Sequence, residues 1–341
     1  MIKNKKYIIV TGGCGFIGSN FIHLINELEP ETKIINIDCL TYAGNIDNLK
    51  GINEQNHFFI KENITNTEAI LNKLPVKEIS AIVHFAAESH VDRSIQSSNN
   101  FIISNVVGTH SMLNLAKHLN IKKFLHISTD EVYGSLGYEG AFTEDSPIKP
   151  NSPYSASKAS SDLLAYSFYK THKLPVIITR CSNNYGKLQY PEKLIPLTIL
   201  RAIENKDIPV YGKGDNIRDW IHVKDHCEAI LLLLNKGKEG EVYNIGGNKE
   251  VKNIDIVKII LNKLNKPDSL IKFVQDRKGH DFRYAIDFSK IKKQLNWSPK
   301  ANFEDMIDKT IKWYQQHPEW CENILNKDYQ DYISKQYRSS I

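Results

Sequence analysis

Two residues with ionisable side chains stand four positions apart in Tyr154-Ser155-Ala156-Ser157-Lys158, after Pro150 and Pro153. In an α-helix this spacing places Tyr154 and Lys158 on one face, one turn apart. A phenol has an ordinary pKa of about 10 and is a poor base at neutral pH, but a nearby ammonium favours the phenolate. The pair therefore predicts a general base, although an exposed tyrosine and lysine on a helix surface would have the same spacing.

Two adjacent acids, Asp130 and Glu131, follow Thr129 at the end of the apolar run Lys123–Ser128. In a closed site two such acids cannot both ionise at low cost, so we expect their pKa values to separate. One acid would then donate a proton and the other would accept one. This arrangement suits the elimination of water, in which a base removes a proton beside a carbonyl and an acid protonates the departing hydroxyl. The alternative is a helix N-cap followed by a solvated loop.

A glycine-rich segment, Thr11-Gly12-Gly13-Cys14-Gly15-Phe16-Ile17-Gly18, lies between an apolar run and an amphipathic segment. Glycines at such a turn let the backbone approach a pyrophosphate, and the following helix N-terminus offers free N–H groups. Asp38 ends the next apolar run, 26 residues after Gly12. A carboxylate there accepts hydrogen bonds from ribose hydroxyls and repels a 2′-phosphate, so the pattern favours NAD over NADP. The alternative is that Asp38 only caps the next turn.

The elements that must position these residues alternate between short β-branched runs and longer helical patterns. Strands are expected at Lys6–Val10, Lys33–Asp38, Ala81–Phe85, Lys123–Ser128, Val176–Arg180 and Glu241–Ile245, and helices at Gly18–Glu29, Ser104–Leu119 and Ser155–His172. Such alternation predicts an α/β fold with a doubly wound parallel (Rossmann) sheet. Ligands bind such sheets outside the carboxyl ends of the strands, where the acid pair is expected to lie.

The pattern changes after Asn184, where prolines and a turn-rich loop at 212–216 interrupt the chain, and an apolar pattern resumes over Trp220–Leu234. We expect a second, smaller α/β domain that binds substrate, with the chain crossing between the domains more than once. The predicted division is residues 1–187 with 223–248 for the NAD-binding domain, and residues 188–222 with 249–341 for the other.

The composition of the 341 residues, with 41% hydrophobic and 24% charged side chains, is that of a globular protein and excludes general disorder. No apolar run approaches the ~20 residues of a membrane helix, and Tyr7–Val10 is too short for a signal-peptide core. The net charge of +5 is spread along the chain, which argues against nucleic-acid binding. The five cysteines are scattered without a CxxC pair, so we expect buried thiols, no metal site and a cytoplasmic protein.

Taken together, these residues resemble the extended short-chain dehydrogenase/reductase family and, within it, the dTDP-glucose 4,6-dehydratases. The wider family shares Thr11–Gly18 and the Tyr154/Lys158 pair. The narrower resemblance rests on seven further segments: Ala86–Ser94, Thr129–Gly134, Asn183–Gly186, Pro191–Pro196, Arg218–Trp220, Gly279–Asp281 and Arg283–Asp287. It runs from about Tyr7 to Trp297, with a family-like aromatic tail beyond.

The resemblance implies a reaction cycle. Tyr154, assisted by Lys158, deprotonates the glucose C4 hydroxyl while the C4 hydride passes to NAD, and Thr129 hydrogen-bonds near that oxygen. Glu131 then removes the C5 proton while Asp130 protonates the leaving C6 hydroxyl. Return of the hydride to C6 gives the 4-keto-6-deoxy sugar used in deoxysugar synthesis, for example of rhamnose. Because the cofactor is regenerated in every turnover, it is expected to stay bound.

The resemblance also implies two sets of binding residues. Those for NAD are Gly12, Gly15, Phe16, Ile17, Gly18, Asp38, Cys39, Leu40, Thr41, Asn63, Ile64, Phe85, Ala86, Ala87, Glu88, Ser89, Ser104, Tyr154, Lys158 and Asn184. Those for dTDP-glucose are Ser89, Thr129, Asn183, Lys193, Leu194, Pro209, Val210, Tyr211, Arg218, Asn253, Asp276, Arg277, Lys278, Gly279 and His280. Arg218 suits a bidentate clamp on the diphosphate, and Tyr211 suits packing on the nucleobase.

The sequence departs from the family pattern at Lys187 and Lys278, where prolines are usual, and at Asn63, where aspartate is common. The two lysines leave the choice between dTDP and UDP open. A related sugar-nucleotide 4-epimerase or UDP-glucuronate decarboxylase is the nearest alternative, but neither needs an acid–base pair at C5 and C6. A third possibility is a non-catalytic scaffold that only binds NAD. Such a scaffold would need none of the four ionisable residues, which are Asp130, Glu131, Tyr154 and Lys158. Homodimers are usual in the family.

Overall fold

The computed structural model describes residues 7–76, 78–325 and 327–337, so Lys6 of the first expected strand lies outside the described residues. Its main feature is a seven-stranded sheet in the order β10-β6-β5-β4-β1-β2-β3, in which every pairing is parallel. The strands are β1 (Tyr7–Thr11), β2 (Lys33–Asp38), β3 (His57–Lys61), β4 (Ala81–His84), β5 (Lys123–Thr129), β6 (Val176–Cys181) and β10 (Val242–Ile245). The predicted parallel α/β sheet is therefore confirmed.

Strand β3 was not expected from the sequence. It lies at the sheet edge, where of its five residues only Ile60 is buried. The strand has an apolar run of only three residues, Phe58–Ile60, between His57 and Lys61, and this run is not buried on both faces as in a central parallel strand.

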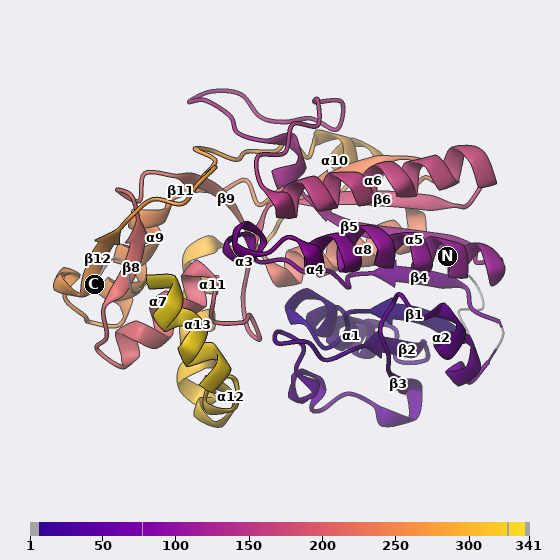
Figure 1. Cartoon of the computed structure of the whole chain (residues 1–341), viewed down its shortest axis with the longest axis horizontal. Coiled ribbons are helices and arrows are strands. Elements are labelled where there is room, and N and C mark those ends of the chain that lie inside the picture. Colours follow the sequence, from indigo (N-terminus) through magenta and orange to yellow (C-terminus); the bar gives the residue numbers. More distant parts are fainter. Residues whose placement is uncertain (1–6, 77, 326, 338–341) are drawn as a thin grey trace.

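Helices cover both faces of this sheet (Figure 1). One face packs against α1 (Phe16–Leu28), α8 (Val223–Lys236) and α10 (Ser289–Leu295), and the other against α2 (Thr67–Lys73), α5 (Gly108–His118) and α6 (Pro153–His172). Successive strand residues alternate between the two cores: Ile8 and Val10 belong to the first and Ile9 to the second. A strand that is buried on both sides in this way is what the unbroken apolar runs indicate.

The second unit lies beside the carboxyl ends of the sheet strands and contains two small sheets (Figure 1). One holds β7 (Asn183–Tyr185), β9 (Ile217–His222) and β11 (Glu250–Lys252), and the other pairs β8 (Ile208–Tyr211) with β12 (Ile271–Val274). Its helices are α7 (Leu194–Ile203), α9 (Asn253–Lys263), α11 (Phe303–Gln316), α12 (Pro318–Ile324) and α13 (Lys327–Tyr337). Trp220, Ile260 and Trp320 belong to its main core, so residues far apart in sequence build it.

The chain passes between the units several times. The apolar stretch Trp220–Leu234 is divided at His222, the N-cap of α8, because β9 belongs to the small unit and α8 to the large sheet. After α9 and β12 the chain returns once more, and Ile291 of α10 lies in the core of the large sheet.

The expected helix Ser104–Leu119 is more complex than its sequence pattern. It is preceded by α3 (Val91–Gln96), α4 (Asn99–Phe101) and a π-helical segment at Ile102–Val107. Short 3₁₀ segments occur at Ile46–Leu49, Glu54–Asn56, Asp130–Tyr133 and Asp268–Leu270. None of the helices in the described part of the chain is long and apolar enough to cross a membrane.

Candidate functional site

The glycine-rich turn joins β1 to α1 at the carboxyl edge of the sheet. Gly12 has φ +71°, and a Cβ there would lie 2.7 Å from the backbone nitrogen of Ala86. A Cβ on Gly18 would come even closer to the backbone oxygen of Gly12, so the turn tolerates no side chain at either position. Gly15 is the N-cap of α1 and supplies no side-chain cap, which leaves the first N–H groups of the helix for a ligand.

Asp38, at the end of β2, lies beside this turn. Its Oδ2 accepts a hydrogen bond from the Cys14 N–H at 2.9 Å, and its Oδ1 accepts one from the Leu40 N–H at 2.8 Å. Burial raises the pKa of the Asp38 carboxyl, against these two hydrogen bonds. The carboxylate thus caps a turn, as the alternative reading had it, and also lines the cavity described next, where its remaining lone pairs face a ligand.

A cavity of about 320 Å³ runs from the glycine turn along the ends of the strands. All the residues expected to bind NAD line this cavity except Leu40. The backbone N–H of Leu40 donates a hydrogen bond to Asp38, which does line the cavity. The cavity also contains Thr129, Asp130, Glu131, Tyr154 and Lys158, so the structure brings the predicted reacting groups to one place. A glycine cradle, a ribose-facing acid and an elongated cavity fit a dinucleotide.

The tyrosine–lysine pair lies at the start of α6. Ser152 caps this helix in a capping box with Ser155, and Pro153 occupies the first turn. The Tyr154 N–H donates to the Ser94 hydroxyl at 3.2 Å, which ties the catalytic end of α6 to α3.

Burial and the negative charge of Glu131 raise the pKa of Tyr154 well above its ordinary value, against a hydrogen bond with Thr129. The Lys158 ammonium donates to the Ile127 carbonyl at 2.7 Å, and burial lowers the Lys158 pKa to about 8. In this geometry the Lys158 ammonium is hydrogen-bonded to the β5 backbone, and Tyr154 is a neutral phenol. Formation of the phenolate therefore needs further positive charge beside the phenol, which an oxidised nicotinamide ring carries.

The two acids differ in their surroundings as the sequence predicts. Asp130 is 2% exposed, and its Oδ2 is buried without a hydrogen-bond partner. Burial and the nearby carboxylates of Glu131 and Asp219 raise the pKa of Asp130 well above its ordinary range. Burial also raises the pKa of Glu131, but three cations oppose that rise: Arg277, Lys193 and Arg218. Asp130 is therefore the member of the pair that more readily keeps a proton, and the three cations favour the charged form of Glu131.

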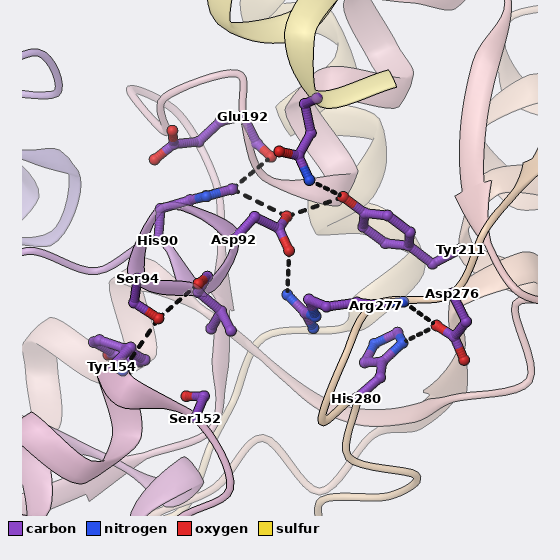
Figure 2. Close-up of polar contacts among 12 residues, drawn as sticks. His90, Asp92, Ser94, Ser152, Tyr154, Glu192, Tyr211, Asp276, Arg277 and His280 are labelled. Atoms are coloured by element: carbon purple, nitrogen blue, oxygen red, sulfur yellow. Dashed lines mark hydrogen bonds and ion pairs between the residues drawn. The ribbon is translucent and has the colours of Figure 1, made fainter. Parts of the chain in front are cut away.

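The residues expected to bind the sugar nucleotide fall into two groups. Ser89, Thr129, Asn183 and Lys193 line the cavity, and Lys193 Nζ donates to the Ser89 carbonyl at 2.8 Å. The others are not cavity-lining and belong to the small unit: Leu194, Pro209, Val210, Tyr211, Arg218, Asn253 and the stretch Asp276–His280. Figure 2 shows Tyr211, Arg277 and His280 gathered opposite α3, and the positive charges of Arg277 and Arg218 act on Glu131.

Two of these residues have partners that their types do not indicate. Arg218 is 5% exposed, and its two terminal nitrogens donate to the backbone carbonyls of Ile217, Asp281 and Phe282. Only the N–H groups of Arg218 that do not donate to these carbonyls are available to a diphosphate. The Tyr211 hydroxyl donates to Asp92 at 3.1 Å, and the Tyr211 ring lies edge-on to His280. Val210 packs in an apolar core, so only its backbone is available to a ligand.

Three residues around the cavity had no assigned role in the sequence. Glu192, 6% exposed, accepts hydrogen bonds from Tyr42 and Arg93, and the Arg93 guanidinium lies 3.8 Å from the Tyr42 ring centroid. Glu192 stands inside the Pro191–Pro196 segment, and Arg93 inside Ala86–Ser94. The sequence segments that contain Glu192 and Arg93 could be recognised, but the contact between these two residues depends on tertiary structure.

Comparison with known proteins agrees with this geometry. Residues 9–310 match a family model described as GDP-mannose 4,6 dehydratase. A dTDP-glucose 4,6-dehydratase from Xanthomonas campestris pv. campestris (strain B100) is 46% identical over 340 residues, which cover 94% of this chain and 96% of that protein.

Two solved structures of dTDP-glucose 4,6-dehydratases are close in fold. The enzyme from Streptomyces venezuelae, crystallised with NAD and dTDP bound, has a TM-score of 0.90 at 44% identity, over 93% of this chain and 99% of that one. The enzyme from Bacillus anthracis in complex with NAD has a TM-score of 0.87 at 49% identity, over 94% and 99%. With the acid pair, the tyrosine–lysine pair and the glycine turn on one cavity, the chain belongs to the dTDP-glucose 4,6-dehydratase family.

Proposed function

We propose that this protein converts dTDP-glucose to dTDP-4-keto-6-deoxyglucose and water, with NAD as a cofactor that each turnover regenerates. The observation that carries the proposal is the acid pair, because Asp130 and Glu131 line the same cavity as Tyr154 and differ in protonation. An enzyme that only oxidises and reduces C4 needs neither group. A scaffold that only holds NAD has no use for a buried carboxyl that has one oxygen without a hydrogen-bond partner.

Each proposed proton transfer uses one of these cavity-lining groups. Tyr154 takes the proton of the C4 hydroxyl, and Thr129, which hydrogen-bonds to the phenol, supports the same oxygen. Oxidation at C4 creates a ketone that acidifies C5, and Glu131 removes that proton. Asp130, which holds its proton, gives it to the C6 hydroxyl as water leaves. Bound NAD would supply the hydride acceptor at C4 and, once reduced, the hydride donor at C6, while Glu131 returns the proton to C5.

The roles of the individual binding residues are part of the proposal. The cavity-lining set around Gly12, Asp38 and Ser104 would hold NAD. Lys193, Arg218, Tyr211 and the Asp276–His280 stretch would hold the sugar nucleotide. We also propose the domain division of residues 1–187 with 223–248 and residues 188–222 with 249–341. The pairing of β7 with β9 and the packing of α10 on β10 would then both be contacts between the two domains.

We further propose that the protein is a cytoplasmic homodimer that binds no nucleic acid. All five cysteines are unpaired, as is usual in a reducing compartment. Exposed apolar side chains gather on two neighbouring elements, the π-helical segment and α6: Ile102, Ile103, Val107, Leu163 and Tyr166, each at least 42% exposed. A second copy of the chain would cover this face, because helices of the sheet domain form the usual dimer contact of the family.

The deciding experiment is product analysis of purified protein mixed separately with dTDP-glucose and UDP-glucose, without added NAD. A 4-keto-6-deoxy product from dTDP-glucose is the expected result, and it requires a retained cofactor. A product from UDP-glucose alone would keep the mechanism and overturn the nucleotide assignment. If neither reacts, repetition with added NAD separates a lost cofactor from a wrong function. A 4-epimer or a decarboxylated sugar in place of the dehydrated product would overturn the proposal.

A further inference from the structure

Asp92, in α3, is a buried carboxylate that connects the two units (Figure 2). Its side chain is 6% exposed. Oδ2 accepts the hydrogen bond from the Tyr211 hydroxyl at 3.1 Å, and Oδ1 lies 3.4 Å from a terminal nitrogen of Arg277. Asp92 follows the cavity-lining stretch 85–89, whereas Tyr211 ends β8 and Arg277 follows β12. One carboxylate of the NAD-binding unit therefore holds two side chains expected to meet the sugar nucleotide.

Arg277 is the charged partner of Asp92 in this cluster. The other titratable neighbour of Asp92, His90, lies 4.0 Å away, and burial lowers the pKa of His90 well below its ordinary value, so it is neutral. The charge of Asp92 raises the pKa of Arg277 against the effect of burial. Tyr211 takes part as a neutral donor, and its hydroxyl in turn accepts a hydrogen bond from Gln336 at 2.8 Å.

The Arg277 guanidinium is not fully used by the protein. Its Nε is buried and has no hydrogen-bond partner among the described residues. A buried donor without an acceptor is costly, so such a group points to an acceptor that a ligand brings. Arg277 also contributes the largest of the three charge effects that lower the pKa of Glu131. The guanidinium thus interacts electrostatically both with Asp92 and with the group proposed as the C5 base.

We propose that Asp92 is a positioning residue of the sugar-nucleotide site. It anchors one end of the Arg277 guanidinium and the Tyr211 hydroxyl, so that the remaining Arg277 donor meets the anionic diphosphate of the substrate. This inference rests on the proposed function, because it takes a nucleoside diphosphate sugar as the ligand.

The test is Asp92→Asn, which keeps an acceptor for Tyr211 and removes the charge. We expect the Kd for dTDP and the KM for dTDP-glucose to rise together by about 10–100-fold, the value of a hydrogen bond to a charged group. The kcat and the amount of NAD that copurifies should stay within about twofold, whereas a general packing defect would lower both. Asp215→Asn is the control, because it also removes a carboxylate charge, but from an exposed ion pair with Lys252 in the small unit.

A double-mutant cycle distinguishes a specific loss of the Asp92–Arg277 interaction from general misfolding. Removal of both charges in the Asp92→Asn, Arg277→Gln variant leaves no unpaired buried ion, and its Kd for dTDP should equal that of Arg277→Gln alone. Additive effects, an unchanged Kd, or a fall in kcat at unchanged KM would overturn the role of Asp92. If the unaltered protein neither binds dTDP nor converts dTDP-glucose, the proposed function itself is wrong.

Discussion

The hydroxyl of Tyr42 donates a hydrogen bond to Glu192 Oε1 at 2.8 Å and so joins two walls of the cavity that are 150 residues apart in the chain. Thr41, Ala43 and Gly44 line one wall, and Tyr190, Glu192 and Lys193 line the other. Arg93 strengthens the link, because its Nε donates to the second Glu192 oxygen at 3.0 Å. We therefore expect this link to slow the release of NAD held in the cavity.

Tyr42→Phe is therefore expected to weaken cofactor retention. Loss of one hydrogen bond to a carboxylate should raise the dissociation rate of NAD about tenfold, while kcat with saturating NAD stays within about twofold. The measurement is the NAD content of the purified protein and its loss during dilution. Tyr138→Phe is the control, since that side chain is 84% exposed. Equal NAD retention in both variants would show that the link does not hold the cofactor.

Glu131→Gln should stop the cycle between oxidation and dehydration. We expect NADH to accumulate in a single turnover and kcat to fall by about 10²–10⁴-fold, because the C5 base is missing. Since the charge of Glu131 raises the pKa of Tyr154, its removal should also let C4 oxidation proceed at a lower pH. Stopped-flow absorbance measures both effects. Deuterium incorporation from solvent at C5 at the rate of the unaltered protein would refute the role of Glu131.

Tyr154→Phe should block the first step. The variant lacks the group that accepts the C4 hydroxyl proton, so mixing with dTDP-glucose should produce almost no NADH and kcat/KM should fall by about 10²–10⁴-fold. The bound NAD should remain, which its absorbance after denaturation measures. A normal burst of NADH would contradict the assignment.

Asp130→Asn should change how stability depends on pH. The pKa of Asp130 is raised in the folded protein, so between its unfolded and folded values the folded state binds more protons, and stability falls as the pH rises. The asparagine removes this dependence, so the melting temperature of the variant relative to that of the unaltered protein should rise as the pH increases above the ordinary aspartate pKa of about 4. The exposed Asp145→Asn variant provides the control. A constant difference in melting temperature across this range would contradict the raised pKa.

Charge placed on the proposed dimer face should separate the subunits. Ile103→Asp and Leu163→Asp, at side chains that are 49% and 59% exposed, should each halve the mass measured by light scattering. Leu28→Asp, at a side chain 55% exposed on α1, should leave the mass unchanged. If all three variants retain the mass of the unaltered protein, this face is not the subunit contact.

Much of the fold could be predicted because its signals are local. The strand Lys33–Asp38 has the predicted bounds, and the helix from Pro153 to His172 begins two residues before its expected start, because Ser152 rather than Tyr154 is the cap. The π-helical segment before α5 was not predictable, since its residues would fit a regular helix equally well. Leu40 shows a similar limit in the site, because its backbone N–H rather than its side chain serves Asp38.

By itself the sequence determined which chemical groups are present and on which elements they lie, because the glycine turn, the Tyr154/Lys158 spacing and the Asp130-Glu131 pair are all contained in short segments. Only the tertiary structure decided which of the two acids keeps its proton. That choice depends on Asp219 near Asp130 and on Arg277 near Glu131, which approach from segments far along the chain. The contact between Asp92 and Arg277 spans 185 residues in the same way. Electrostatic effects fall with distance in space and not along the chain, so only folding determines the charge of each acid.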